Sequence, residues 1–216
     1  VSPVFLHYDN ILNVLQTMSE IGLLVLAESL IMLTGRMDLS LESTFGLAPG
    51  FAAWLIVATG VSHGLGLLGV VWAIPLTIAI GAAIGAFNGL LIVRFRLSGF
   101  VVTLGMLIGL RGLLTGISKG QTFFDLPPSM VYLGQNSLLG IPMSIWICVV
   151  AFSIAIIVLG FTRWGRALYA IGGNSDAARA AGIRTDRVVW TVLIVAGMLA
   201  ALGGLPISGR LASGAA

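Results

Sequence analysis

The sequence predicts an all-α integral membrane protein, a polytopic helical bundle with about six transmembrane segments. The first reason is composition: 58% of the residues are hydrophobic and 9% are charged, against about 25% charged residues in a soluble domain. The second is that the apolar runs are long enough to span a bilayer, which takes about 20 residues of helix. The third is that no run alternates in hydrophobicity as membrane β-barrel strands do, so the segments must satisfy their backbone groups as helices.

Six apolar segments are the predicted spans. The fourth, 99–118, is the candidate for a re-entrant segment, which would change the count of crossings. The connection after it contains Pro127 and Pro128, which interrupt helices, so residues 119–140 are predicted to form a loop with some local structure. In chain order the predicted spans cover residues 11–34, 39–60, 67–93, 99–118, 141–161 and 188–209.

The arginines are distributed unequally over the connections between these segments. Lys and Arg are enriched in the cytoplasmic loops of membrane proteins. If all six segments cross, one side receives only Lys119 and Arg210, so residues 1–10 and 119–140 are predicted to face outward. The other side, predicted to be cytoplasmic, receives Arg36, Arg94, Arg96, Arg163, Arg166, Arg179, Arg184 and Arg187.

Small residues recur every four positions in two of the segments. Glycines at this spacing let helix backbones approach closely in lipid. We expect these stripes to pack within the chain, and a subunit interface is the alternative. The stripes are Gly81, Gly85 and Gly89 in one segment, and the two pairs Gly105/Gly109 and Gly112/Gly116 in the next.

No group of residues predicts catalysis, a cofactor site or a metal site. Residues 64–69 fit GxGxxG, but they lack the preceding strand and the later acidic residue that a dinucleotide site needs. No Walker-type ATP motif is present. Cys148 is the single cysteine, which excludes an internal disulfide, and His7 and His63 lack metal-ligand spacing. The basic residues that give the net charge of +3 lie mainly in the predicted membrane loops, so we expect no nucleic-acid partner. Because no cofactor motif is found, we also expect no cofactor.

The most informative stretch is the arginine-rich loop, residues 163–187. Asn174 or Ser175 can cap a helix start, and Asp176 suits the positive end of the helix dipole. Alanines follow, and Gly182 offers the left-handed conformation that ends many helices. The pattern predicts a two-turn helix on the membrane surface that docks on a partner. A plain basic loop that only anchors the topology is the alternative.

Three blocks of the chain together resemble one protein family. They are residues 34–44, 85–121 and 165–188, and the resemblance extends over about residues 10–214. They are similar to the membrane permease subunit of bacterial ABC sugar importers of the ribose, xylose and galactose type. Two positions depart from the family pattern: Glu42 stands where a glycine is common, and Ser98-Gly99 where prolines are common.

The third block resembles the E-A-A-x-x-x-G docking loop of ABC import permeases, with aspartate in place of glutamate. The resemblance implies that this helix couples the permease to an ATPase. Arg179 is then expected to reach acidic or carbonyl groups of the partner. The implied ATPase-coupling residues are Asn174, Asp176, Ala177, Ala178, Arg179 and Gly182.

The resemblance further implies a non-enzymatic subunit of the inner membrane that forms the path for a monosaccharide or a related small polar solute. The implied partners are ABC ATPase subunits, an extracytoplasmic solute-binding protein, a second permease copy or a homologous permease, and membrane lipid. Residues 1–216 form one permease domain on this interpretation. Permeases of the family have more spans, so we expect a fragment. The alternatives are a permease for branched-chain amino acids or nucleosides, and an ATP-independent secondary transporter.

Polar residues next to or inside the spans are candidates for a path or a coupling role. Asp38 or Ser40 can cap the second span, and Asp38 can pair with Arg36; a coupling role is the alternative. Asn88 is expected to bond a neighbouring helix, or else to line the path.

Two charges are predicted to lie at similar depths in the membrane. Glu20 and Arg111 lie about 13 and 10 Å from the outer ends of their segments, at ~1.5 Å per residue. We expect both to face the interior, where they either pair or flank an aqueous path. The alternative is that Arg111 reaches the outer interface while Glu20 bonds a neighbouring helix.

Overall fold

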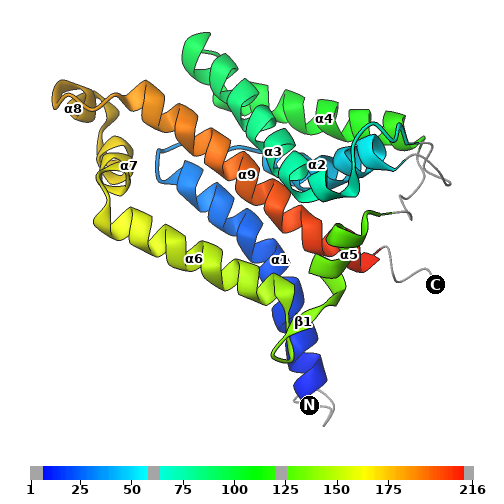
Figure 1. Cartoon of the computed structure of the whole chain (residues 1–216). Helices are drawn as coiled ribbons and strands as arrows, with labels where there is room; N and C mark the ends of the chain where they lie inside the picture. Colours follow the sequence, from blue (N-terminus) through cyan, green and yellow to red (C-terminus); the bar gives the residue numbers. More distant parts are fainter. Residues whose placement is uncertain (1–6, 58–63, 120–125, 212–216) are drawn as a thin grey trace.

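The computed structural model of the chain describes residues 7–57, 64–119 and 126–211 (Figure 1). These ranges are mostly helical, which confirms the all-α class. One short antiparallel hairpin joins β1 (Ser137–Leu138) to β2 (Ile141–Pro142). The helices are α1 (Tyr8–Met32), α2 (Ser40–Ile56), α3 (Ala73–Gly89), α4 (Gly99–Ser118), α5 (Pro128–Gln135), α6 (Met143–Phe161), α7 (Arg163–Gly173), α8 (Ser175–Ala180) and α9 (Thr185–Leu211), with a 3-10 turn, η2 (Val70–Trp72), before α3 and a π-helical turn, η3 (Leu90–Arg94), after it.

Five helical stretches in the described part of the chain are long and apolar enough to cross a membrane. They cover residues 10–32, 70–94, 99–118, 143–161 and 185–211. The remaining predicted span, 39–60, forms α2, whose 17 residues extend over about 26 Å, less than a bilayer core of about 30 Å. Residues 58–60 of that span and 120–125 of the predicted outer loop lie outside the described residues.

Helix α9 is the central element of the bundle. It contacts α1, α2, α3 and α5, and Figure 1 shows it running between α1 on one side and α3 on the other. Helix α4 packs on α2, and α6 packs on α1, so both lie at the periphery. Their outer faces are apolar and exposed, as expected for helices that contact lipid.

Glycines set the distance between α3 and α9. A side chain at Gly81 would collide with the Gly197 backbone, and one at Gly85 with the Leu193 carbonyl. Gly89 lies against the ring of Trp190, whose indole N–H donates to the Ala86 carbonyl at 3.0 Å. The glycine stripe of α3 therefore packs within the chain, as the sequence predicts.

The glycine stripe of α4 does not follow that prediction. No atom from elsewhere in the described chain lies within 4 Å of the position that a Cβ would take at Gly105, Gly109, Gly112 or Gly116. The expectation of intramolecular packing is therefore wrong for α4 in the described residues. The four-residue spacing shows only that the glycines share a face, and the tertiary structure decides whether another helix covers it.

Replacing Gly81 with leucine should lower the unfolding midpoint of the detergent-solubilised protein. The added side chain would push α3 away from α9, and overpacking of this kind costs about 1–3 kcal/mol. Gly109→Leu is the matched control, because its position on α4 is open, and it should leave the midpoint nearly unchanged. Equal losses in the two variants would contradict this packing.

Candidate functional site

The arginine-rich loop is more ordered than the sequence predicts, because it holds two helices rather than one. Thr162 begins α7: its Oγ1 accepts a hydrogen bond from the Gly165 N–H at 3.1 Å. Helix α7 is amphipathic and buries Leu168 and Ile171. A turn at Asn174 then leads into α8, so the chain presents α8 at one end of the bundle (Figure 1).

Helix α8 is capped as its sequence suggests, but it is shorter than two full turns. The Asn174 Oδ1 atom accepts hydrogen bonds from the N–H groups of Asp176 and Ala177, both at 3.0 Å. Of the two candidate caps, Asn174 is therefore the one used. At the other end Gly182 has φ +85°, the left-handed conformation expected for it, and the Ile183 N–H donates to the Ala178 carbonyl at 3.0 Å.

The residues of α8 divide into an inner and an outer set. Ala178 is buried in the apolar core beneath the loop, so it packs inward and is not available to a partner. Arg179 is exposed, but its guanidinium donates to the Thr185 hydroxyl at 3.2 Å and lies 3.5 Å from an Asp186 carboxylate oxygen. These contacts hold α8 against the start of α9. Asp176 and Ala177 remain exposed.

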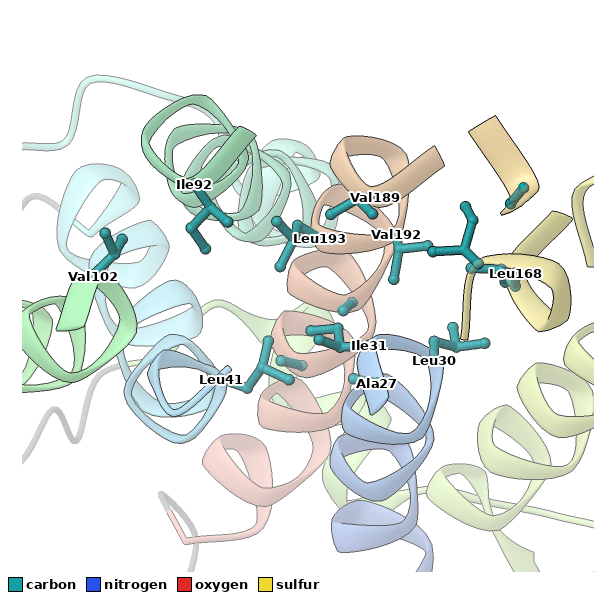
Figure 2. Close-up of a cluster of buried hydrophobic side chains, with 14 residues drawn as sticks. Ala27, Leu30, Ile31, Leu41, Ile92, Val102, Leu168, Val189, Val192 and Leu193 are labelled. Carbon is teal, nitrogen blue, oxygen red and sulfur yellow. The ribbon is translucent and has the colours of Figure 1, made fainter. Parts of the chain in front are cut away.

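An apolar core connects the arginine-rich loop to the membrane-spanning helices. Figure 2 shows Leu168 of α7 facing Val192 of α9 and Leu30 of α1. All three side chains are buried. Ile92 of η3 and Leu41 of α2 belong to the same cluster. A displacement of α7 and α8 would therefore be transmitted by direct packing to α1 and α9.

A second buried group, the polar clasp of Asp38, Ser40 and Asn88, connects the α1–α2 turn to α3. The Asp38 Oδ1 atom accepts hydrogen bonds from the Ser40 N–H at 2.8 Å and the Ser40 hydroxyl at 2.6 Å. The Asn88 amide donates to Asp38 Oδ2 at 3.2 Å and to Ser40 Oγ at 2.7 Å. All three are at most 4% exposed. Asp38 lies one residue before the N-cap, Leu39, and accepts the hydrogen bond of the first N–H of α2. Asn88 bonds a neighbouring segment as predicted.

The Asp38 carboxyl has no cationic partner in the described part of the chain. The expected ion pair with Arg36 is not formed there. The Asp38 N–H donates to Glu28 Oε1 at 3.3 Å, which brings a second carboxylate close. Burial raises the pKa of Asp38 above its ordinary value, and the hydrogen bonds from Ser40 and Asn88 oppose part of that rise. Glu28 was not among the predicted site residues, although an acid inside an apolar span was an available signal.

Glu20 and Arg111 do not pair. Glu20 is fully buried, and its Oε2 atom lies 3.0 Å from Nη2 of Arg210 on α9. Arg111 is exposed on α4, where its guanidinium lies 4.0 Å from the exposed Glu42 carboxylate. The expected pairing is therefore wrong, and so is an inward-facing Arg111. The pairing was predicted only from the similar depths of the two residues in the membrane. Which charge Glu20 meets depends instead on which helices pack together, and α1 packs on α9.

The Glu20–Arg210 pair lies where α1, α5 and α9 meet, at the opposite end of the bundle from α8. The Gln16 amide donates to the Gly134 carbonyl at 3.1 Å, and the Gln135 amide donates to the Gly209 carbonyl at 3.2 Å. Gly134 and Gly209 allow α5 and α9 to touch closely. These contacts close the bundle at the end that carries the predicted outward loop.

A groove between α1, α6 and α9 has a volume of about 480 Å³, but its lining does not suit a sugar. Trp146, Val150 and Leu199 are among the lining residues, and nearly all of the lining surface is apolar. A sugar needs hydrogen-bonding partners. In the described ranges, no group of three His, Cys, Asp or Glu side chains could hold a metal ion.

Removing the cap of α8 should loosen that helix specifically. Asn174→Ala deletes the acceptor of two N–H groups, a change that costs about 1 kcal/mol. Hydrogen exchange of the Asp176 and Ala177 amides should accelerate severalfold. Asn174→Asp is the matched control, because aspartate caps helices as well as asparagine does. The same exchange rates in both variants would argue against the cap.

Arg210→Gln should destabilise the protein far more than Arg111→Gln. The first change leaves Glu20 buried without its cation, and breaking a buried pair costs about 3 kcal/mol or more. The second removes an exposed pair worth about 0–1 kcal/mol. Thermal unfolding of both variants in the same detergent measures the difference. Equal midpoints would show that the Glu20–Arg210 pair is not structural.

The chain is similar in sequence to known transport permeases. A family described as "Branched-chain amino acid transport system / permease component" matches residues 10–214. The ribose import permease protein RbsC of Bacillus subtilis (strain 168) is 36% identical over 99% of this chain and 64% of its own length. The L-arabinose ABC transporter permease protein AraH of Azospirillum brasilense is 33% identical over 98% of the chain and 60% of its own length.

A relative with a different named substrate is the autoinducer 2 import system permease protein LsrC of Enterobacter sp. (strain 638). It is 32% identical over 98% of this chain and 59% of its own length. The chain thus spans about three fifths of the length of these relatives. No solved structure matches it. The family match and the apolar helices identify a multi-pass inner-membrane protein. The chain belongs to the family of permease components of branched-chain amino acid transport systems.

Proposed function

We propose that this chain is the transmembrane subunit of an ATP-binding-cassette importer. On this proposal it is not itself an enzyme, and ATP is hydrolysed by separate partner subunits. The observation that carries the proposal is α8, a capped helix at the bundle end where Arg36, Arg96 and Arg179 meet. A short helix held this way offers a partner a firm surface, and the apolar core beneath it leads to α1 and α9.

The outer set of α8 supplies the docking surface in this proposal. Asp176 and Ala177 are exposed, and so is Ala180. Their small side chains permit close approach of a groove on the ATPase. Asn174, Ala178, Arg179 and Gly182 then act indirectly, since they fix the position and the ends of the helix. Arg179 is committed to Thr185 and Asp186, so the role of reaching a partner's acids falls to other arginines.

Transport follows from two arrangements of the bundle that bind the ATPase differently. Closure of the ATPase subunits would push α8 and α7, and the packing around Leu168 would pass the displacement to α1 and α9. The polar clasp has a coupling role in this scheme, because it makes α3 follow the α1–α2 turn. We assign Asn88 to the clasp rather than to the translocation path. Glu20 likewise contributes to stability at the far end.

The proposed cargo is a monosaccharide or a related small polar solute. The relatives are named for import of ribose and L-arabinose, and another for autoinducer 2. The family description favours a second candidate, a branched-chain amino acid. The proposed partners are two ABC ATPase subunits, an extracytoplasmic solute-binding protein, and a second copy of the chain or a homologous permease. Uptake of labelled ribose and labelled leucine by the full-length protein in its complex separates the two cargo classes.

The double variant Ala177→Trp/Ala180→Trp should weaken association with the ATPase by at least about tenfold, which corresponds to 1.4 kcal/mol. The indoles would occupy the space that the partner's groove needs, and transport should fall with assembly. Co-purification and uptake assays on the full-length complex measure both effects. Ala83→Trp, an exposed alanine on α3 outside the loop, is the control. Normal assembly and transport by the double variant would refute the docking role.

A further inference from the structure

A polar pocket of about 590 Å³ lies beside α8, separate from the surface proposed to dock the ATPase. Five segments line it: the turn after α1, the end of η3 and the residues that follow it, α7 through Ile171, α8, and the start of α9. Three long apolar helices have one end at the pocket. The spans 10–32 and 70–94 end there, and the span 185–211 begins there. The pocket therefore lies at the level where a bilayer has its headgroups.

The charges that line this pocket are unbalanced. Three arginines, Arg36, Arg96 and Arg179, line it together with a single carboxylate, that of Asp186. Arg179 and Asp186 pair with each other at 3.5 Å. Arg36 and Arg96 have no ion-pair partner among the residues that the structure describes. Two arginines from distant parts of the sequence thus line one pocket, and neither is paired with a carboxylate of the described residues.

The backbone at Arg96 supports a binding role. Arg96 has φ +55°, in the left-handed region that few residues other than glycine adopt. Such conformations are maintained at a cost and are frequent at ligand sites. The π-helical turn η3 precedes it, and the Leu97 N–H donates to the Leu91 carbonyl at 3.2 Å. The chain thus turns back sharply here, with Arg96 at the pocket.

Exposed apolar side chains flank the two arginines. Met37 is 58% exposed next to Arg36, and Phe95 and Leu97 are 62% and 49% exposed on either side of Arg96. A free phosphate ion would leave these apolar side chains exposed, whereas the acyl chains of a lipid would cover them. Guanidinium groups bind phosphate oxygens in a bidentate geometry. Basic pockets between membrane helices recognise the headgroups of anionic lipids.

We propose that this pocket binds the phosphate group of an anionic phospholipid, held between Arg36 and Arg96, with its acyl chains along Met37, Phe95 and Leu97. A bound headgroup would bridge the end of α1 and the end of α3 beside α8. It would therefore stabilise the arrangement in which α8 is seated on the bundle, because a ligand that binds one arrangement favours it. The proposal concerns binding and does not depend on the transported solute.

The test uses the full-length permease in nanodiscs of phosphatidylcholine with or without phosphatidylglycerol. Phosphatidylglycerol should raise the unfolding midpoint of the wild type by about 3 °C. Arg36→Gln/Arg96→Gln should lose most of this rise. Arg163→Gln/Arg166→Gln removes the same charge from exposed positions on α7 that do not line the pocket, so it should retain the rise. A rise in the pocket variant equal to that of the wild type, or an equal loss in the control, would overturn the proposal.

A second measurement avoids the risk that the pocket variant fails to fold. Phenylglyoxal modifies accessible arginines, and mass spectrometry locates the modified residues in the wild type. Phosphatidylglycerol should slow modification of Arg36 and Arg96 severalfold and leave Arg163 unaffected. Protection by inorganic phosphate alone in phosphatidylcholine would reject a lipid in favour of a free anion. Protection that appears only when the ATPase is added would reject it in favour of an acidic protein segment.

Discussion

Close backbone contact between α9 and its neighbours is the constraint on which the rest of this structure depends. In lipid there is little hydrophobic gain from helix association, so helices adhere through close packing and hydrogen bonds. Gly81 and Gly85 of α3 meet Gly197 and Leu193 of α9, while Gly204 admits the Phe45 carbonyl of α2. Because α9 is so closely surrounded, three features are held in fixed positions. They are the polar clasp, the Glu20–Arg210 pair and the apolar core beneath the arginine-rich loop.

The two ends of the bundle are held together by different kinds of contact. At one end, Glu20 and Arg210 join α1 to α9, and α5 closes against both, so this end resists opening. At the other end the loop helices rest on an apolar core, which can slide more readily than a buried ion pair can break. A force applied to α8 would therefore tilt α1 and α9 about their firmly joined far end. Such a tilt is what the proposed function requires of the bundle.

Local sequence patterns predicted local structure well. The Asn174 cap and the left-handed Gly182 were predictable, because each is decided by hydrogen bonds within a few residues along the chain. The length of α8 was overestimated, and α7 was missed. The amphipathic pattern of Arg163–Gly173 was an available helix signal, but its three glycines weaken it. Burial of Leu168 and Ile171 in the core stabilises the helix. The coupling role of the residues in the docking-loop motif remains a prediction.

The sequence by itself determined the class of the fold, the end at which the arginines gather, and, to within one, the number of long apolar helices in the described residues. It also limited the N-terminal cap of α8 to Asn174 or Ser175 and predicted Gly182 at its C-terminal end. These properties depend on composition and on neighbours within a turn or two of helix. Only the tertiary structure decided that Glu20 meets Arg210 and not Arg111, that Ala178 faces inward, and that Arg36 and Arg96 share a pocket. Each of these contacts joins segments far apart in the chain. Their pairing follows from which helices pack on α9, and no pattern within a single segment records that choice.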